Sequence, residues 1–396
     1  MPIEKLHIEQ FLQLAQHHPV LDVRSPGEFA HAHIPGAYAL PLFTDEERKI
    51  VGTTYKQQSR ESAIKVGLDF FGPKMRGMVE EVEKLVDSLQ MTACLSGRQV
   101  DGKETKNKSK TVLVHCWRGG MRSAGVAWLL DLYGFKVYTL VGGYKFFRRW
   151  VLNQFEKQWS FNIIGGYTGS GKTELLKQFA DLGERVIDLE SLAHHKGSAF
   201  GNIGMPAQPS QEMFENRIAL KLFHVSSAAH KRGNGHVTQN SYTSEIDTIW
   251  MEDESQRIGT VNIPHQLWGL MRKSNVFFLD IPFSERLSHI TEEYGQLDLE
   301  KMIAAVERIQ KRLGGLETKT TISFLRKGNI IEAFRILLKY YDKWYLKGLH
   351  NRENFEQLCH SVSLATVDAF GNAIHLKQFI QSFSTQKNTI DEPGVR

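Results

Sequence analysis

The sequence predicts an α/β protein of two or three domains, the first of them built on a parallel sheet. Three observations lead to this prediction. Short apolar segments typical of strands alternate with longer segments of helical periodicity. Two glycine-containing loops, at 115–122 and 166–173, each join such a strand directly to a helix. From Lys301 onward the pattern is helical, which predicts a helical C-terminal part.

The composition is that of an ordinary globular enzyme. The 396 residues are 41% hydrophobic and 23% charged, and the net charge of +5 permits a polyanionic partner such as RNA without demonstrating one. We expect no membrane association, since there is no apolar leader and no apolar stretch long enough to cross a bilayer. The cysteines Cys94, Cys116 and Cys359 are too scattered for a disulfide framework or a paired zinc site, which favours a cytoplasmic protein.

The first domain is predicted at residues 1–145. Its strands are expected at Val20–Val23, Thr111–His115 and Lys136–Leu140, with a helix at Ser123–Tyr133. The segment 96–110 is polar and net basic, which indicates a loop-like insertion just before the second of these strands.

The loop from His115 to Arg122 contains the first candidate site. Cys116 follows a strand, precedes a helix and has Arg118 and Arg122 nearby. Backbone N–H groups, the helix dipole and guanidinium groups each lower a thiol pKa, so we predict a nucleophilic thiolate at Cys116 in a cradle for an anion. The alternative is a buried structural cysteine that happens to precede a helix.

The second domain is predicted at 161–345, after a helical linker at 146–160 and before a C-terminal extension at 346–396. The segment 144–159 has apolar residues at helical spacing. Strands of this domain are expected at Phe161–Ile164, Arg185–Leu189, Thr248–Met251 and Val276–Leu279.

The second loop matches G-x-x-x-x-G-K-[ST] and lies between a strand and a helix, as a P-loop does. Its phosphate-binding residues are predicted to be Gly166, Gly169, Ser170, Gly171, Lys172 and Thr173. Lys172 can reach outer phosphate oxygens, and the Thr173 hydroxyl suits Mg²⁺. If Mg²⁺ binds, the acidic partner is expected to be Asp253, Glu252 or Asp280, each of which follows an apolar strand and could equally be an exposed strand-end acid. No Asn-Lys-x-Asp motif, which would recognise guanine, follows the P-loop, so a regulatory GTPase is not favoured.

Two further groups of residues are candidate substrate contacts. The polar segment from Asp188 to Gly201 could present His195, Lys196 and Ser198 beside the P-loop, although a capped helix followed by a plain loop is an equal alternative. Arg148 and Arg149 are candidate RNA contacts, with solvated surface charge as the alternative.

The N-terminal motifs resemble a rhodanese domain. They are Asp22-Val23-Arg24-Ser25-Pro26-Gly27-Glu28-Phe29, His33-Ile34-Pro35-Gly36-Ala37 and Leu40-Pro41. The resemblance implies a rhodanese-like parallel-sheet fold that carries Cys116. The loop departs from the usual sulfurtransferase pattern, because Arg122 lies six residues after Cys116 where five are typical. In this respect it resembles the loops of cysteine-dependent phosphatases and arsenate reductases, which favours a larger group in the cradle.

A rhodanese domain with Cys-Trp-Arg-Gly-Gly-Met-Arg-Ser, joined to a P-loop domain with the segment Asp188–Gly201, resembles the bacterial tRNA 2-selenouridine synthase family. The segment from Asp45 to Gln58 is also similar to that family. The resemblance implies a transferase that replaces sulfur by selenium in 2-thiouridine at the tRNA wobble position. It further implies selenophosphate as the selenium donor and an S-geranylated intermediate made from geranyl diphosphate at the P-loop. Cys116 would carry selenium as a selenosulfide, with Arg118 and Arg122 stabilising the anion. No prosthetic group is expected.

Two other functions remain open from the residues. The Cys-x5-Arg spacing suits a cysteine-dependent phosphatase or an arsenate-reductase-like enzyme fused to a nucleotide-binding domain. The chain could also be a non-catalytic, nucleotide-gated sulfur carrier. The sequence does not reveal the oligomeric state, the accepted tRNAs or the residues of a geranyl pocket.

Overall fold

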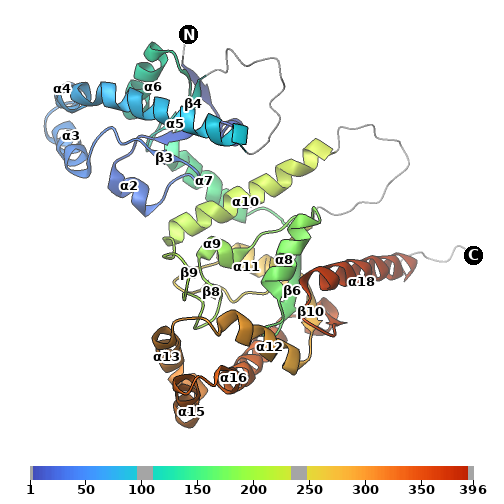
Figure 1. The fold of residues 1–396 in the computed structure, drawn as a ribbon. Coiled ribbons are helices and arrows are strands. Elements are labelled where there is room, and N and C mark those ends of the chain that lie inside the picture. The colour runs from blue at the N-terminus through green and yellow to red at the C-terminus, as the bar shows by residue number, and fades with distance from the viewer. Residues whose placement is uncertain (1–2, 96–109, 233–247, 391–396) are drawn as a thin grey trace, which may run out of the picture. The chain divides into compact units, whose positions relative to one another are not determined.

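The computed structural model describes residues 3–95, 110–232 and 248–390, and the chain divides into two compact units, Met1–Asn153 and Gln154–Arg396 (Figure 1). The insertion expected at 96–110 lies outside the described residues except for Lys110, whose ammonium group pairs with Glu83 at 3.1 Å. Among the described residues no helix combines the length and the apolar character that spanning a bilayer requires.

The first unit contains a parallel sheet with strand order β1-β5-β4-β2-β3. Its strands are β1 (Glu4–Leu6), β2 (Val20–Asp22), β3 (Tyr38–Ala39), β4 (Thr111–His115) and β5 (Lys136–Leu140). Every residue of β4 is buried, as expected of the central strand of a parallel sheet covered on both faces. The three strands predicted from the sequence are therefore confirmed.

Helices flank this sheet, and several of them pack on it through a shared apolar core. They are α1 (Ile8–Leu14), α2 (Pro26–His31), α3 (Asp45–Gln57), α4 (Arg60–Phe71), α5 (Met75–Leu95), α6 (Met121–Tyr133) and α7 (Gly143–Phe155), with the 3₁₀ turn η1 at Gly72–Lys74. Val82 of α5, Val126 and Leu130 of α6 and Val112 of β4 are fully buried in that core. The helix predicted at Ser123–Tyr133 is confirmed and begins two residues earlier, at Met121.

The second unit contains a parallel sheet with strand order β11-β10-β6-β7. Its strands are β6 (Phe161–Gly166), β7 (Ile249–Glu252), β10 (Asn275–Asp280) and β11 (Cys359–Ser363), and an antiparallel pair is formed by β8 (Arg257–Ile258) and β9 (Val261–Asn262). Its helices are α8 (Lys172–Asp181), α9 (Leu189–Ala193), α10 (Gln211–Arg232), α11 (His265–Arg272), α12 (Phe283–Tyr294), α13 (Leu299–Arg308), α14 (Gln310–Leu313), α15 (Gly315–Arg326), α16 (Ile330–His350), α17 (Phe355–Leu358) and α18 (Ala369–Ile390).

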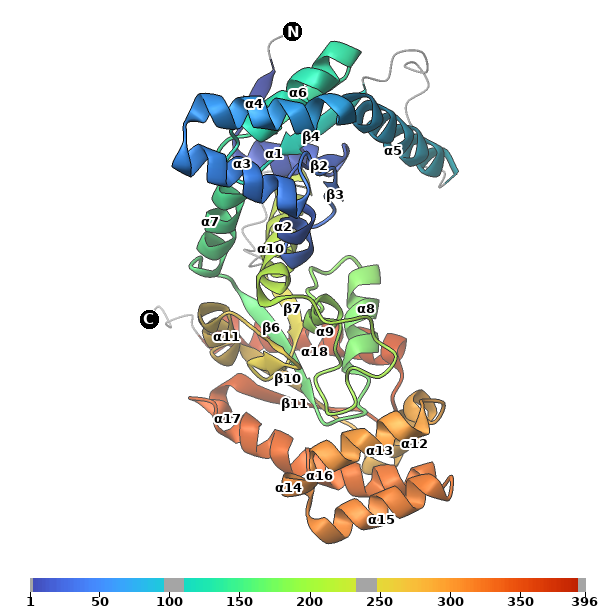
Figure 2. The ribbon, with the colours of Figure 1, turned by 90° about the vertical axis from the view of Figure 1, so that its left-hand side faces the viewer.

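The predicted helical C-terminal part is confirmed. Helices α12, α13, α15 and α16 share a core of their own that includes Ile290, Met302, Val306, Phe334 and Leu338. Figures 1 and 2 both show these four helices gathered at one end of the second unit.

Two predictions for the second unit need correction. The strand expected at Arg185–Leu189 is reduced to a single bridge between Val186 and Trp250, because the Asp188 carboxylate accepts a hydrogen bond from the Ser191 N–H at 2.8 Å and starts α9. The segment 346–396, expected to be an extension, supplies strand β11 to the sheet and helix α18, which packs on α8. Val362 is the one fully buried side chain of β11, so the strand leaves little hydrophobic signal in the sequence.

A buried ion pair at the end of β2 supports the first unit. Arg24 is 1% exposed and Asp22 is 0% exposed. The Arg24 guanidinium donates to both Asp22 carboxylate oxygens at 2.6–3.0 Å and to the Ala32 carbonyl at 2.7 Å. It also lies 3.7 Å from the centre of the Tyr144 ring. Burial by itself would raise the pKa of Asp22, but buried His115 and Arg24 outweigh it and hold the pKa below its ordinary value.

Replacing Arg24 should therefore destabilise the first unit strongly. We expect Arg24→Met to lower the free energy of unfolding at pH 7 by about 3–5 kcal/mol, because it removes the guanidinium that neutralises the buried Asp22 carboxylate. Since the folded-state pKa of Asp22 is depressed, its contribution to wild-type stability should be complete above pH about 4 and be lost as the pH falls further. Urea unfolding at several pH values measures both effects. Arg76→Met, which removes a fully exposed pair with Glu80, is the control that should change nothing.

Candidate functional site

Cys116 lies at the carboxyl end of β4, in the loop that leads into α6. Its side chain is buried, and its Sγ atom lies 3.3 Å from the Ser123 hydroxyl. Burial would raise the pKa of the thiol, but hydrogen bonds from the Ser123 hydroxyl and from the backbone N–H groups of Ser123, Arg118 and Gly120 outweigh it. The pKa of Cys116 therefore lies below its ordinary value, as expected of a nucleophilic thiol.

The start of α7 closes the Cys116 loop from behind. The N–H of Tyr144 donates to the Cys116 carbonyl at 2.8 Å, and the N–H of Lys145 donates to the Trp117 carbonyl at 2.9 Å. Gly143 has a φ of +58°, and a Cβ atom there would overlap the Cys116 carbonyl oxygen. Gly143 thus allows a second chain segment to approach the loop closely.

The two arginines of the loop have different surroundings. Arg118 is exposed and contributes its backbone N–H to the thiol. Arg122 Nη1 donates to Glu28 Oε2 at 3.0 Å. Glu28 also accepts from the Ser25 N–H at 3.2 Å in the capping box of α2. The Asp22–Phe29 motif is therefore joined to the cysteine loop by an ion pair that sequence reasoning did not predict.

The segment 166–173 forms a P-loop between β6 and α8. Gly166, Gly169 and Gly171 have φ values of +151°, +81° and +70°, conformations that favour glycine. The Lys172 ammonium donates to the carbonyls of Gly166 at 3.0 Å and Tyr167 at 3.4 Å. Lys172 is the first residue of α8, so the free N–H groups of that helix face the loop.

Residues far away in the sequence hold the P-loop. The Arg286 guanidinium donates to the Thr168 carbonyl at 3.1 Å and to both Asp342 oxygens at 3.0 and 2.9 Å. The Tyr345 hydroxyl accepts from the Gly166 N–H at 3.0 Å and donates to Asp253 at 2.9 Å. Sequence reasoning missed Arg286, Asp342 and Tyr345, because they lie in helical segments without a motif.

Three carboxylates meet beside the P-loop. Oxygens of Glu190, Glu252 and Glu254 lie within 4.8 Å of one another, and the Thr173 hydroxyl lies 3.4 Å from Glu190. Burial and repulsion between neighbouring carboxylates raise the pKa of Glu190 to about 9 and that of Glu254 to about 8, with Lys172 opposing the rise. The pKa of Glu252 is raised for the same reasons.

These carboxylates fit a divalent cation. Glu252 is 1% exposed, and its Oε1 atom has no hydrogen-bond partner among the described residues. Oxygen ligands at the end of a strand next to a P-loop threonine are the kind that Mg²⁺ takes. Thr173 and Glu252 would hold the ion, with Glu190 and Glu254 nearby.

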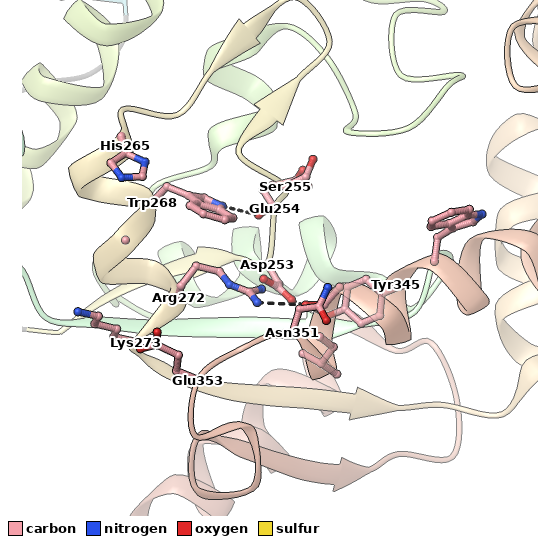
Figure 3. A pocket seen from close by; sticks show the side chains of 14 residues that line it. Asp253, Glu254, Ser255, His265, Trp268, Arg272, Lys273, Tyr345, Asn351 and Glu353 are labelled. Atoms are coloured by element: carbon pink, nitrogen blue, oxygen red, sulfur yellow. Dashed lines mark hydrogen bonds between the residues drawn. The ribbon is translucent and has the colours of Figure 1, made fainter. Parts of the chain in front are cut away.

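Asp253 and Asp280 do not belong to this cluster, contrary to the expectation for a metal partner. The Asp253 carboxylate is paired with Arg352. It also accepts a hydrogen bond from the Tyr345 hydroxyl (Figure 3). Successive side chains of an extended chain point to opposite sides, so Glu252 and Glu254 face the cluster and Asp253 faces away. Asp280 is exposed at the end of β10.

The segment after α9 is only partly directed at this site. Gly197 lies against the cluster, since a Cβ atom there would come within 2.9 Å of both Glu190 and Glu254. Lys196 instead pairs with Glu293 at 2.5 Å, His195 is buried, and the Ser198 hydroxyl accepts from the Phe200 N–H at 3.2 Å. Arg148 and Arg149 lie on α7 in the first unit, half-buried and exposed respectively.

The fold and the two sites define an α/β protein in which a rhodanese-like cysteine domain precedes a P-loop domain. Residues 159–373 match the family described as tRNA 2-selenouridine synthase AAA domain. Curated relatives named tRNA 2-selenouridine synthase include one from Nitrosomonas europaea, 30% identical over 84% of this chain and 90% of the relative. Another, from Hydrogenovibrio crunogenus, is 34% identical over 75% of this chain and 76% of the relative. The chain therefore belongs to the tRNA 2-selenouridine synthase family.

Similarity to solved structures is local. The N-terminal domain of a putative ATP/GTP binding protein from Clostridium difficile 630 is 33% identical, covers 38% of this chain and 99% of that chain, and gives a TM-score of 0.31.

The thiol of Cys116 should react at a lower pH than the thiol of Cys359. We expect its rate of alkylation by iodoacetamide to rise through a pKa below the ordinary thiol value. Ser123→Ala should move that pKa upward, because it removes a hydrogen bond to the thiolate. Peptide mass spectrometry across a pH series measures both. Cys359, whose pKa is raised by burial, is the control within the same protein. Equal profiles for Cys116 and Cys359 would refute the activation of Cys116.

Proposed function

We propose that this protein replaces sulfur by selenium in the wobble 2-thiouridine of tRNA, with geranyl diphosphate and selenophosphate as co-substrates. Family membership supports the overall reaction, since the relatives are named tRNA 2-selenouridine synthase. One observation supports dividing the reaction into two steps. A single chain contains an activated thiol in an anion-binding loop and a P-loop beside buried carboxylates.

The first step is geranyl transfer at the P-loop. The sulfur of 2-thiouridine attacks C1 of geranyl diphosphate, a C–S bond forms, and the C–O bond breaks with its electron pair going to diphosphate. The free N–H groups at the start of α8 and the Lys172 ammonium hold the diphosphate and stabilise its developing charge. Thr173 and Glu252 would hold a Mg²⁺ ion, which would supply further positive charge near the leaving group. Alkylation converts the sulfur into a thiolate leaving group for the second step.

The second step draws selenium from selenophosphate at Cys116. Selenium in selenophosphate is already at the selenide oxidation level, so a selenosulfide on Cys116 would need an oxidant. Attack of the Cys116 thiolate on phosphorus needs none, because the S–P bond forms as the P–Se bond breaks and hydrogen selenide leaves. Water then hydrolyses the phosphocysteine. Selenide adds to C2 of the geranylated base, and geranylthiolate departs.

The backbone of the cysteine loop suits this role. The N–H groups of Arg118, Gly120 and Ser123 converge on the thiol, where the phosphoryl oxygens of selenophosphate would lie. Arg122 is at the rim of the loop, with Glu28 holding its guanidinium. We therefore assign Arg118 and Arg122 to binding the anion and Cys116 to the nucleophilic attack.

The two steps should be separable by substitution. We expect Cys116→Ala to form geranylated 2-thiouridine normally but no 2-selenouridine. Lys172→Ala should slow geranyl transfer by at least about a hundredfold, the range for loss of one charge-stabilising group. The same variant should still catalyse selenium transfer when it is given tRNA that is already geranylated. Nucleoside mass spectrometry with purified components distinguishes the products, and Cys359→Ala is the control. Selenium transfer by Cys116→Ala would refute the role of Cys116, and undiminished geranylation by Lys172→Ala would refute that of the P-loop.

Metal binding should depend on the carboxylate cluster. We expect Glu252→Gln to weaken Mg²⁺ or Mn²⁺ binding at least tenfold in calorimetry, because it removes a charged oxygen ligand. Wild-type affinity should rise with pH towards about 8–9, since the ion must displace protons from carboxyls whose pKa is raised. Asp280→Asn is the matched control and should bind as the wild type does. An unchanged affinity in Glu252→Gln would show that Glu252 is not a ligand of the metal ion.

A further inference from the structure

A cavity of about 710 Å³ opens beside the P-loop within the second unit, a size in the usual range for a small-molecule site. Its walls come from α11, the chain after β7 and the C-terminal half of α16 with the segment that follows it (Figure 3). His265, Trp268 and Arg272 contribute from one face of α11, and Trp344, Tyr345 and Gly348 contribute from α16.

Two tryptophans in the cavity wall have cations near their rings. Trp344 is 42% exposed, and the Lys347 ammonium and the Arg312 guanidinium lie 5.4 and 5.8 Å from the centre of its ring. The Arg272 guanidinium lies 5.6 Å from the ring of Trp268. Trp344 is the exposed ring of the two and Trp268 is half-buried. An exposed aromatic ring with cations beside it is a surface on which a nucleic-acid base stacks while phosphates are neutralised.

The charge of the cavity favours an anion. Arg272 and the exposed Lys273 line it. Of the acidic residues, Asp253 is already paired with Arg352, and Glu254 belongs to the carboxylate cluster beside the P-loop. Glu353 is the one remaining carboxylate among the lining residues that the structure describes.

The cavity also shares residues with the phosphate site. Glu254 lines the cavity and belongs to the carboxylate cluster. Tyr345 lines the cavity, and its hydroxyl accepts from the Gly166 N–H of the P-loop at 3.0 Å. Tyr345 therefore forms part of the cavity wall and also contacts the P-loop.

We propose that this cavity binds an unstacked nucleotide of the tRNA anticodon loop, with its base on Trp344 and its phosphates near Arg272 and Lys273. Proteins recognise single-stranded RNA loops by splaying bases onto aromatic side chains, and this cavity has the rings and the charge for that. A purely apolar prenyl chain would make no use of the cations. The inference rests on the proposed tRNA substrate and locates where that substrate docks.

The test uses the full chain and a fluorescent anticodon stem-loop that carries 2-thiouridine. We expect Trp344→Ala to weaken binding in fluorescence anisotropy by roughly tenfold or more, as loss of one stacked base does, and Trp344→Phe to restore most of it. Lys273→Ala should reduce the slope of log affinity against log salt concentration by about one, as expected for the loss of one phosphate contact. Trp128→Ala is the matched control, since Trp128 is 51% exposed on α6 in the other unit, and it should bind as the wild type does.

Wild-type affinity in Trp344→Ala would overturn the inference. So would a Trp344→Ala protein that keeps its RNA affinity but binds geranyl diphosphate more weakly, since the cavity would then be a prenyl site. Both results leave the proposed function intact. A wild-type protein that binds the thiolated stem-loop no better than a DNA hairpin of equal charge would overturn both the inference and the proposed function.

Discussion

Both sites of this protein depend on backbone N–H groups that have no partner within a helix. A parallel strand that turns directly into a helix leaves the N–H groups of the first helical turn at the carboxyl edge of the sheet. In the first unit these groups surround Cys116 between β4 and α6. In the second unit they belong to the P-loop between β6 and α8. Each loop can therefore hold an anion before any charged side chain takes part.

The charged side chains around these loops have mostly a supporting role. Arg24 is buried with Asp22 behind the cysteine loop and lies against Tyr144, whose N–H binds the Cys116 carbonyl. Arg286 is buried, pairs with the half-buried Asp342 and binds the Thr168 carbonyl of the P-loop. An ion pair of this kind orients the loop backbone without occupying the N–H groups at the start of the following helix.

The carboxylate cluster is the exception, because its charge is not balanced within the protein. Among the described residues, Lys172 is the cation that lowers the pKa of all three carboxyls, Glu190, Glu252 and Glu254, and burial and mutual repulsion raise these pKa values in spite of it. Such a group of acids is costly to bury as anions, so the cluster has to take up protons or a metal ion. A carboxylate cluster that needs protons or a cation lies beside the P-loop. The cluster and the P-loop together indicate phosphate binding in the second unit more specifically than the P-loop motif alone does.

The sequence by itself determined the fold class, the strand-loop-helix units and the residues of both loops, because hydrophobic periodicity and glycine spacing are local properties of the chain. It did not determine which acid faces Thr173, since Glu252 and Asp253 are neighbours and only the direction of each side chain separates them. Tyr345 and Arg286 reach the P-loop from more than a hundred residues away, and β11 completes the sheet with a single fully buried side chain. Only the tertiary structure decided these points, because pairing across the sheet and packing of distant helices are set by contacts that no local pattern records.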